Sequence, residues 1–149
     1  MSTLELIRET FHPEPYPTLE NDITGALLHC FREGVGNCKY VLLVSEIGKM
    51  TDIRTLIQSQ KKELKKFYHA SVMKGIGVIE IFLGKHADWK TSVHDVKPDW
   101  HGLQSVILQG LLFIDPETKR HELTQSHWGP IKLETFKDKW IRFTIYEER

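Results

Sequence analysis

The chain has 149 residues, of which 20 are basic and 20 are acidic, and its formal net charge is +0. This length fits one domain, residues 1–149, that needs neither a disulfide nor a metal to fold, and the balanced charge argues against sequence-independent binding to nucleic acid or an anionic membrane. Two cysteines, no apolar run long enough to span a bilayer and no signal-peptide pattern at the start predict a reduced, cytoplasmic protein without a membrane partner.

The first part of the chain is predicted to be helical. A short helix is expected over residues 2–11, with Ser2 or Thr3 as its N-cap. Three prolines in residues 12–17 forbid both helix and strand. A second helix is expected to begin at Thr18, because the apolar residues that follow have helical spacing. These residues are Ile23, Ala26, Leu27, Cys30 and Phe31.

The middle of the chain is predicted to contain one clear helix and one clear strand. Residues 38–47 are ambiguous, because a run this apolar suits either a buried strand or a helix buried on all sides. Residues 51–68 are predicted to form an amphipathic helix, with apolar side chains on one face and lysines on the other. Residues 76–83 are predicted to form a mostly buried strand bounded by glycines.

The last part of the chain is predicted to form an antiparallel sheet. Residues 103–108 and 111–114 are expected to pair as a hairpin around Gln109-Gly110. Asp115-Pro116 begins a strong turn pattern. A short helix or loop at residues 131–140 and a final strand are expected to close the chain. This order predicts an α+β protein with N-terminal helices packed on a C-terminal antiparallel sheet.

Metal-dependent chemistry finds little support in the residue spacing. Residues 86–101 are rich in His and Asp, but no pair has the spacing that puts two ligands on one helix face, so neither a metal nor a cofactor is predicted. A nuclease needs clustered carboxylates and a lysine, and Glu46, Lys49 and Glu80 form no compact motif. The segment ENDITGALL (20–28) is similar to the first helix of some bacterial defence nucleases, so a metal-dependent nuclease remains an alternative.

A thiol, an imidazole and an acid occur in an order that suits nucleophilic catalysis. Cys38 follows a glycine-rich stretch, His101 directly precedes a predicted strand, and Asp115 ends the next one. In the predicted hairpin, His101 and Asp115 would lie at the same edge of the sheet, within hydrogen-bonding reach. Cys38 would have a lowered pKa if residues 38–47 were a helix, because it would lie at the positive end of that helix.

Several segments together resemble the papain-like cysteine peptidases of the bacteriocin-processing type. The matching segments are GIGVIEIFL (75–83), His101, LLFIDP (111–116) and IKLETFKDKW (131–140). The resemblance covers about residues 70–145 and implies a papain-like fold that acts on amide bonds.

The resemblance also implies roles for particular residues. Cys38 would attack the amide, His101 would act as general base and then acid, and Asp115 would orient the imidazole. The family carries its cysteine at the start of its first long helix, and the matching segment of this chain has Ile23 at that position. The resemblance therefore implies either a thiol hydrolase or an inactive relative that binds a peptide or protein. A small interaction protein with another partner is a further alternative.

Overall fold

The computed structural model describes residues 2, 4–5, 7, 18–19, 23–33, 39–99 and 104–125. Its strands are β1 (Thr18–Leu19), β2 (Ala26–Glu33), β3 (Lys39–Glu46), β4 (Ile76–Leu83), β5 (Val106–Ile114) and β6 (His121–Gln125). Its helices are α2 (Ile53–Phe67), the short α3 (His86–Trp89) and the 3-10 turn η1 (Ser92–His94). The strands form one six-stranded sheet in chain order. Strands β3, β4 and β5 are parallel, and the outer neighbours pair antiparallel.

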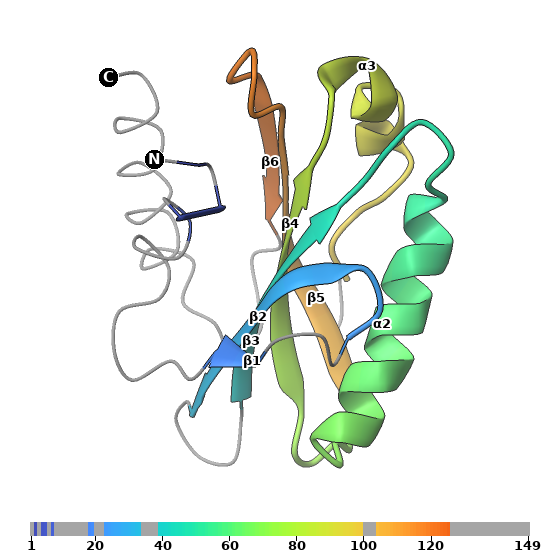
Figure 1. Cartoon of the computed structure of the whole chain (residues 1–149). Coiled ribbons are helices and arrows are strands. Elements are labelled where there is room, and N and C mark those ends of the chain that lie inside the picture. The colour runs from blue at the N-terminus through green and yellow to red at the C-terminus, as the bar shows by residue number, and fades with distance from the viewer. Residues whose placement is uncertain are drawn as a thin grey trace.

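The helix α2 connects β3 to β4 and covers one face of the sheet (Figure 1). It begins after Asp52, whose carboxylate accepts a hydrogen bond from the Thr55 amide at 3.2 Å. The predicted helix over residues 51–68 and the predicted strand over residues 76–83 are both confirmed. Every residue of β4 is buried, as expected for a central parallel strand that is covered on both faces.

Two apolar layers lie on the two faces of the sheet. The layer beneath α2 includes Phe82 and Phe113, whose rings stack with centroids 5.1 Å apart, and Trp89 of α3 packs on Phe113. The opposite layer includes Ile81 and Leu112, both fully buried. This alternation follows from the pleat, which sends successive side chains to opposite faces.

The predicted arrangement of N-terminal helices on a C-terminal antiparallel sheet, papain-like in form, is wrong. The sheet already begins in the first part of the chain, and its three central strands are parallel. The segment predicted as the second helix contains β2 instead. There Leu28 and Cys30 join one apolar layer, whereas Phe31 packs against the other. The apolar spacing favours a helix, but pairing with β1 and β3 makes this segment a strand, and that tertiary contact cannot be read from the spacing.

Two further predictions are settled by strand pairing. Residues 39–46 are the strand β3, so the helical interpretation of residues 38–47 is wrong. The hairpin around Gln109-Gly110 is also wrong, because β5 runs through both residues as one strand. Val78 pairs with Leu108 and the next residue of β4 pairs with Gly110, so Gln109 is an extra residue in the strand. The glycine therefore marks a β-bulge and not a turn.

The predictions of a cap at the start of the chain and of a turn at Asp115 are confirmed. The Ser2 hydroxyl accepts a hydrogen bond from the Glu5 amide at 3.2 Å, and the Glu5 carboxylate accepts one from the Ser2 amide at 2.8 Å. This capping box confirms Ser2 as an N-cap, and Leu4, Glu5 and Ile7 are helical. The turn at Asp115-Pro116 is confirmed as well. The helix or loop predicted at residues 131–140 and the final strand lie outside the described residues.

Replacing Gly84 with alanine should destabilise the protein. A Cβ atom at this position would lie 2.7 Å from the Ile47 carbonyl oxygen, and the Ile47 amide is itself hydrogen-bonded to the Leu83 carbonyl at 2.9 Å. Because backbone at such a site yields little, we expect the free energy of unfolding to fall by about 1–3 kcal/mol in urea denaturation. Gly48→Ala is the control, since a Cβ there meets no described atom within 4 Å. Equal losses in the two variants would contradict this reasoning.

Candidate functional site

Asp115 lies at the carboxyl end of β5 and organises the turn that leads to β6. Its Oδ1 accepts hydrogen bonds from the amides of Glu117 at 2.9 Å and Thr118 at 3.3 Å, and its Oδ2 accepts one from the amide of His86 at 2.9 Å. Burial alone would raise the pKa of the Asp115 carboxyl, but these amide hydrogen bonds outweigh it and lower the pKa to about 2. Asp115 thus caps its own turn and ties it to the start of α3.

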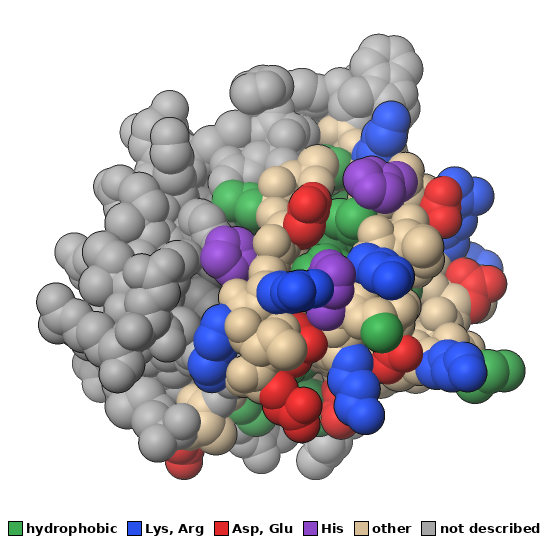
Figure 2. All heavy atoms as spheres, turned by 90° about the horizontal axis from the view of Figure 1, so that it is seen from above, with side chains coloured by type: hydrophobic (Ala, Val, Ile, Leu, Met, Phe, Trp, Pro, Cys, Tyr) green, Lys and Arg blue, Asp and Glu red, His purple; other side chains and the backbone are tan. Residues whose placement is uncertain are grey.

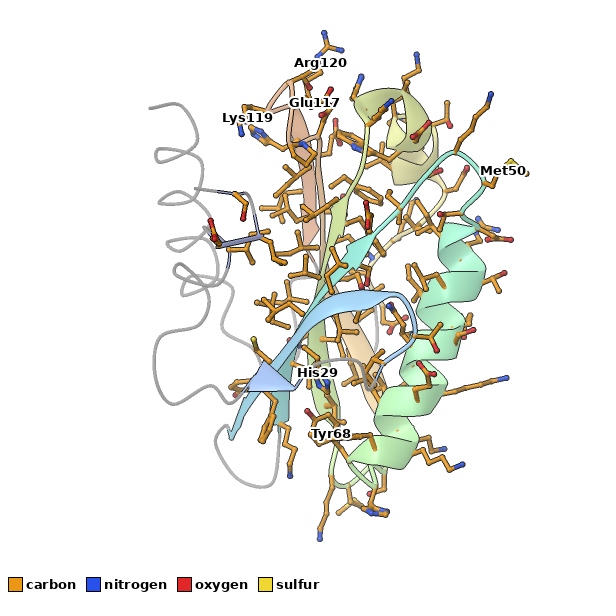
Figure 3. The ribbon with its side chains drawn as sticks, in the orientation of Figure 1. His29, Met50, Tyr68, Glu117, Lys119 and Arg120 are labelled. Carbon is orange, nitrogen blue, oxygen red and sulfur yellow. The ribbon has the colours of Figure 1, made fainter. Side chains whose placement is uncertain are left out.

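The surface around this turn mixes charges of both signs. Figure 2 views the molecule from this end and shows basic, acidic and histidine side chains interspersed. Glu117, Lys119 and Arg120 stand together on the turn (Figure 3). The guanidinium of Arg120 contacts Nδ1 of His86 at 3.1 Å.

The predicted catalytic set of Cys38, His101 and Asp115 stays a prediction, because Cys38 and His101 lie outside the described residues. The structure nevertheless removes two reasons for expecting this catalytic set. The contact between His101 and Asp115 was expected from a hairpin that does not form. The lowered pKa of the Cys38 thiol was expected from a helix at residues 38–47, where the structure has the strand β3.

Within the described residues, the side chains considered above for metal binding do not form a metal site. No group of three His, Cys, Asp or Glu side chains that could hold a metal ion occurs there. Glu80 is buried, whereas Glu46 and Lys49 are exposed at the end of β3 and in the turn that follows. In the His- and Asp-rich stretch, Asp99 pairs with Lys61 at 2.6 Å.

A polar network is buried between α2 and the sheet. The Ser45 hydroxyl donates to Oε1 of Glu80 at 2.7 Å, and Nε2 of Gln60 donates to the Ser45 oxygen at 2.9 Å and to the Thr24 carbonyl at 3.0 Å. Within the described part of the chain, Oε1 of Gln60 has no partner. Burial raises the pKa of the Glu80 carboxyl to about 8, although the hydrogen bond from Ser45 lowers it somewhat. Glu80 is therefore mainly protonated at neutral pH.

Two more contacts fasten α2 to the strand β2 and the turn before it. The carboxylate of Glu63 accepts hydrogen bonds from the amide and hydroxyl of Thr24, at 2.9 and 2.6 Å. Near the end of the helix, the Tyr68 hydroxyl contacts Nε2 of the buried His29 at 2.7 Å (Figure 3). We interpret these polar contacts and the buried network as structural, since they hold the helix on the sheet. Glu80 alone was visible in the sequence, as a single charge inside an apolar run.

An open groove of about 500 Å³ lies beside α2, on the side where the chain passes from η1 to β5. Its lining comes from one face of α2, from residues 95–99 and from β5. The lining residues are Arg54, Thr55, Ile57, Gln58, Ser59, Lys61, Lys62, Asp95, Val96, Lys97, Asp99 and Leu108. We call this feature the α2 groove.

Hydrogen bonds between distant parts of the sequence hold the walls of the α2 groove. Arg54 donates from Nε and Nη2 to the Asp95 carbonyl, at 3.1 and 2.8 Å. Oδ2 of Asp99 accepts from both Lys61 Nζ at 2.6 Å and the Leu108 amide at 2.7 Å. The helix, the connecting segment and β5 are therefore fixed relative to one another at this site. The sequence showed the lysines of α2 but not the residues that face them.

Comparison of the chain with protein-family models, with curated proteins and with solved structures gives no match in any of the three. None of the helices in the described ranges combines the length and apolar character needed to cross a membrane. Within the described residues, the α2 groove offers an open surface on which a functional proposal can be based.

The stability of the protein should fall as the pH rises from about 4.5 to about 8. In the unfolded chain Glu80 ionises near its ordinary pKa of 4.5, whereas in the folded protein its pKa is about 8. Between these values only the folded state holds the proton, so rising pH favours unfolding until the folded carboxyl has also ionised. Since one pKa unit corresponds to about 1.4 kcal/mol, the total loss should be on the order of 3–5 kcal/mol. Urea denaturation at about pH 5, 7 and 9 measures it.

Glu80→Gln is the matched control for this pH dependence. The glutamine has a similar shape and can still accept the hydrogen bond from Ser45, but it has no proton to lose in this range. Its stability should therefore change less between pH 5 and pH 9 than that of the parent protein. Parallel profiles for the two proteins would show that another group is responsible.

Cys30 should resist alkylation by iodoacetamide in the folded protein. Its side chain is completely buried, and a thiol that the reagent cannot reach does not react. We expect protection throughout the range from about pH 5 to pH 9, measured by mass spectrometry of peptides. A single reactive thiol then reports on Cys38: fast reaction below neutral pH, slowed by His101→Ala, would support the predicted catalytic set. Rapid labelling of Cys30 would contradict its burial.

Proposed function

We propose that this protein is a binding domain that holds a short segment of a peptide or protein in the α2 groove. The observation that carries the proposal is the groove itself, which combines an apolar floor with a polar rim. Ile57, Val96 and Leu108 supply the apolar part, each with less than a tenth of its surface exposed, and six charged residues share the lining. Such a combination is typical of protein interfaces, where apolar contacts are enclosed by polar ones.

The fixed walls of the groove support this proposal. Both the Arg54–Asp95 and Lys61–Asp99 contacts hold the walls through groups of the protein itself. A site that is already ordered loses little conformational entropy when a ligand binds, so more of the contact energy contributes to affinity. A groove of this volume suits a segment of a few residues and not a whole folded surface.

Catalysis on an amide bond by Cys38, His101 and Asp115 is the alternative proposal, and it depends on the reactivity of the Cys38 thiol. A role as a metal-dependent nuclease rests only on the segment ENDITGALL (20–28). The cytoplasmic compartment also stays a prediction, and it would make the partner an intracellular peptide or protein.

Selection from a random peptide library should yield ligands that need the α2 groove. Ser59 is exposed and lines the groove, so Ser59→Trp should obstruct it and weaken the selected peptides by about tenfold or more. Met50 is 93% exposed, lies outside the lining and points away from the body of the protein (Figure 3). Met50→Trp therefore adds the same ring elsewhere and should leave affinity unchanged. Fluorescence anisotropy with labelled peptides measures both.

Two results would contradict this proposal. If selected peptides bind the parent protein and the Ser59→Trp variant with the same affinity, the α2 groove is not their site. The same conclusion follows if repeated selection gives no peptide whose binding this substitution weakens.

A further inference from the structure

We infer that the α2 groove selects an acidic ligand, namely a peptide segment with carboxylate side chains flanking an apolar one. This inference rests on the proposed function and adds the chemistry of the partner. The lining contains four basic residues and two acidic ones. What matters for a ligand is which of these charges are already compensated inside the protein.

One acidic residue of the groove is already neutralised. Asp99 accepts hydrogen bonds from Lys61 Nζ at 2.6 Å and from the Leu108 amide at 2.7 Å. Its negative charge is therefore compensated within the protein. Apart from this ion pair, the lining has three basic residues, Arg54, Lys62 and Lys97, and one acidic residue, Asp95. The groove therefore carries an excess of positive charge although the whole chain has a net charge of +0.

Arg54 is the residue best prepared to meet a carboxylate. Its guanidinium is held by the Asp95 carbonyl, which is a neutral acceptor, so the hydrogen bonds orient the group without cancelling its charge. The exposed carboxylate of Asp52 also attracts the guanidinium and offsets only part of this charge. These bonds use Nε and Nη2, whereas a guanidinium carries further donors on Nη1. An oriented guanidinium favours planar acceptors such as carboxylates, because less side-chain entropy is lost for each bond formed.

The apolar floor decides which kind of anion fits. Ile57, Val96 and Leu108 line the groove with the small part of their surface that is exposed, and a bare nucleic-acid backbone offers this apolar surface nothing to pack against. An aliphatic side chain between two acidic residues would cover this floor while its neighbours reach the cations. An acidic peptide thus uses both parts of the groove.

Two capped tripeptides that differ only in charge test this inference. The acidic probe is acetyl-Glu-Leu-Glu-amide and the neutral probe is acetyl-Gln-Leu-Gln-amide, each titrated into isotope-labelled protein and followed by amide chemical shifts. The acidic probe should perturb the amides of residues 54–62, 95–97 and 99 and bind about tenfold more tightly than the neutral one. A moderate rise in salt concentration should reduce this difference, because salt screens exposed charges.

Charge-removing variants localise the effect. Arg54→Gln and Lys97→Gln should each weaken the acidic probe by about two- to fivefold, and weaken it more than they weaken the neutral probe. Lys97 has an exposed side chain, so its variant tests the charge even if Arg54→Gln disturbs the wall of the groove. Lys66→Gln is the control, since Lys66 is an exposed lysine of α2 outside the lining. It should change neither affinity.

Three results with short probes would overturn the inference. They are equal binding of the two tripeptides, no perturbation of the groove by the acidic one, and tighter binding of a short oligothymidylate than of the acidic peptide. The proposed function is judged separately, by the Ser59→Trp comparison with library peptides. If Ser59→Trp weakens the binding of library peptides that are neutral, the inference about acidic ligands is wrong but the proposed binding function is supported.

Discussion

The complete burial of β4 constrains most of this structure. This strand also pairs in parallel with both of its neighbours, and parallel pairing requires a connection that returns the chain to the same end of the sheet before each next strand. The helix α2 provides that return from β3, and α3 with η1 provides it before β5. Both connections contribute to the same apolar layer, in which Ile57 and Val93 are buried together with Phe82. The other face is covered by a separate apolar layer.

The same constraint explains the unusual chemistry of Glu80. Its position along β4 directs its side chain beneath α2, where water cannot stabilise a carboxylate. The protein keeps the carboxyl neutral and satisfies it with the Ser45 hydroxyl, which is in turn bonded to Gln60 of the helix. Such a chain of directional bonds fixes the rotation of the helix on the sheet, which apolar contacts alone define less sharply. It also makes the stability of the fold depend on pH between about 4.5 and about 8.

The α2 groove is a consequence of the second connection. After η1 the chain must travel back along α2 to reach the start of β5, and residues 95–99 therefore run beside the helix without filling the space next to it. Arg54 and Lys61 bind this segment through a carbonyl and a carboxylate respectively. Charges that are about forty residues apart in sequence thereby line one surface. The excess of cations there is a local property that the net charge of the chain hides.

The sequence by itself determined the elements whose cause is local. The amphipathic pattern of α2, the apolar run of β4, the Ser2 cap and the Asp115 turn each depend on neighbouring residues, and all four were predicted. Tertiary structure decided the identity of β2 and the continuity of β5 through Gln109-Gly110, because both depend on a partner strand. The predicted fold class was wrong for the same reason. The groove could not be predicted either, since α2 shows its own lysines but not the distant segment that faces them, and only packing brings the two together.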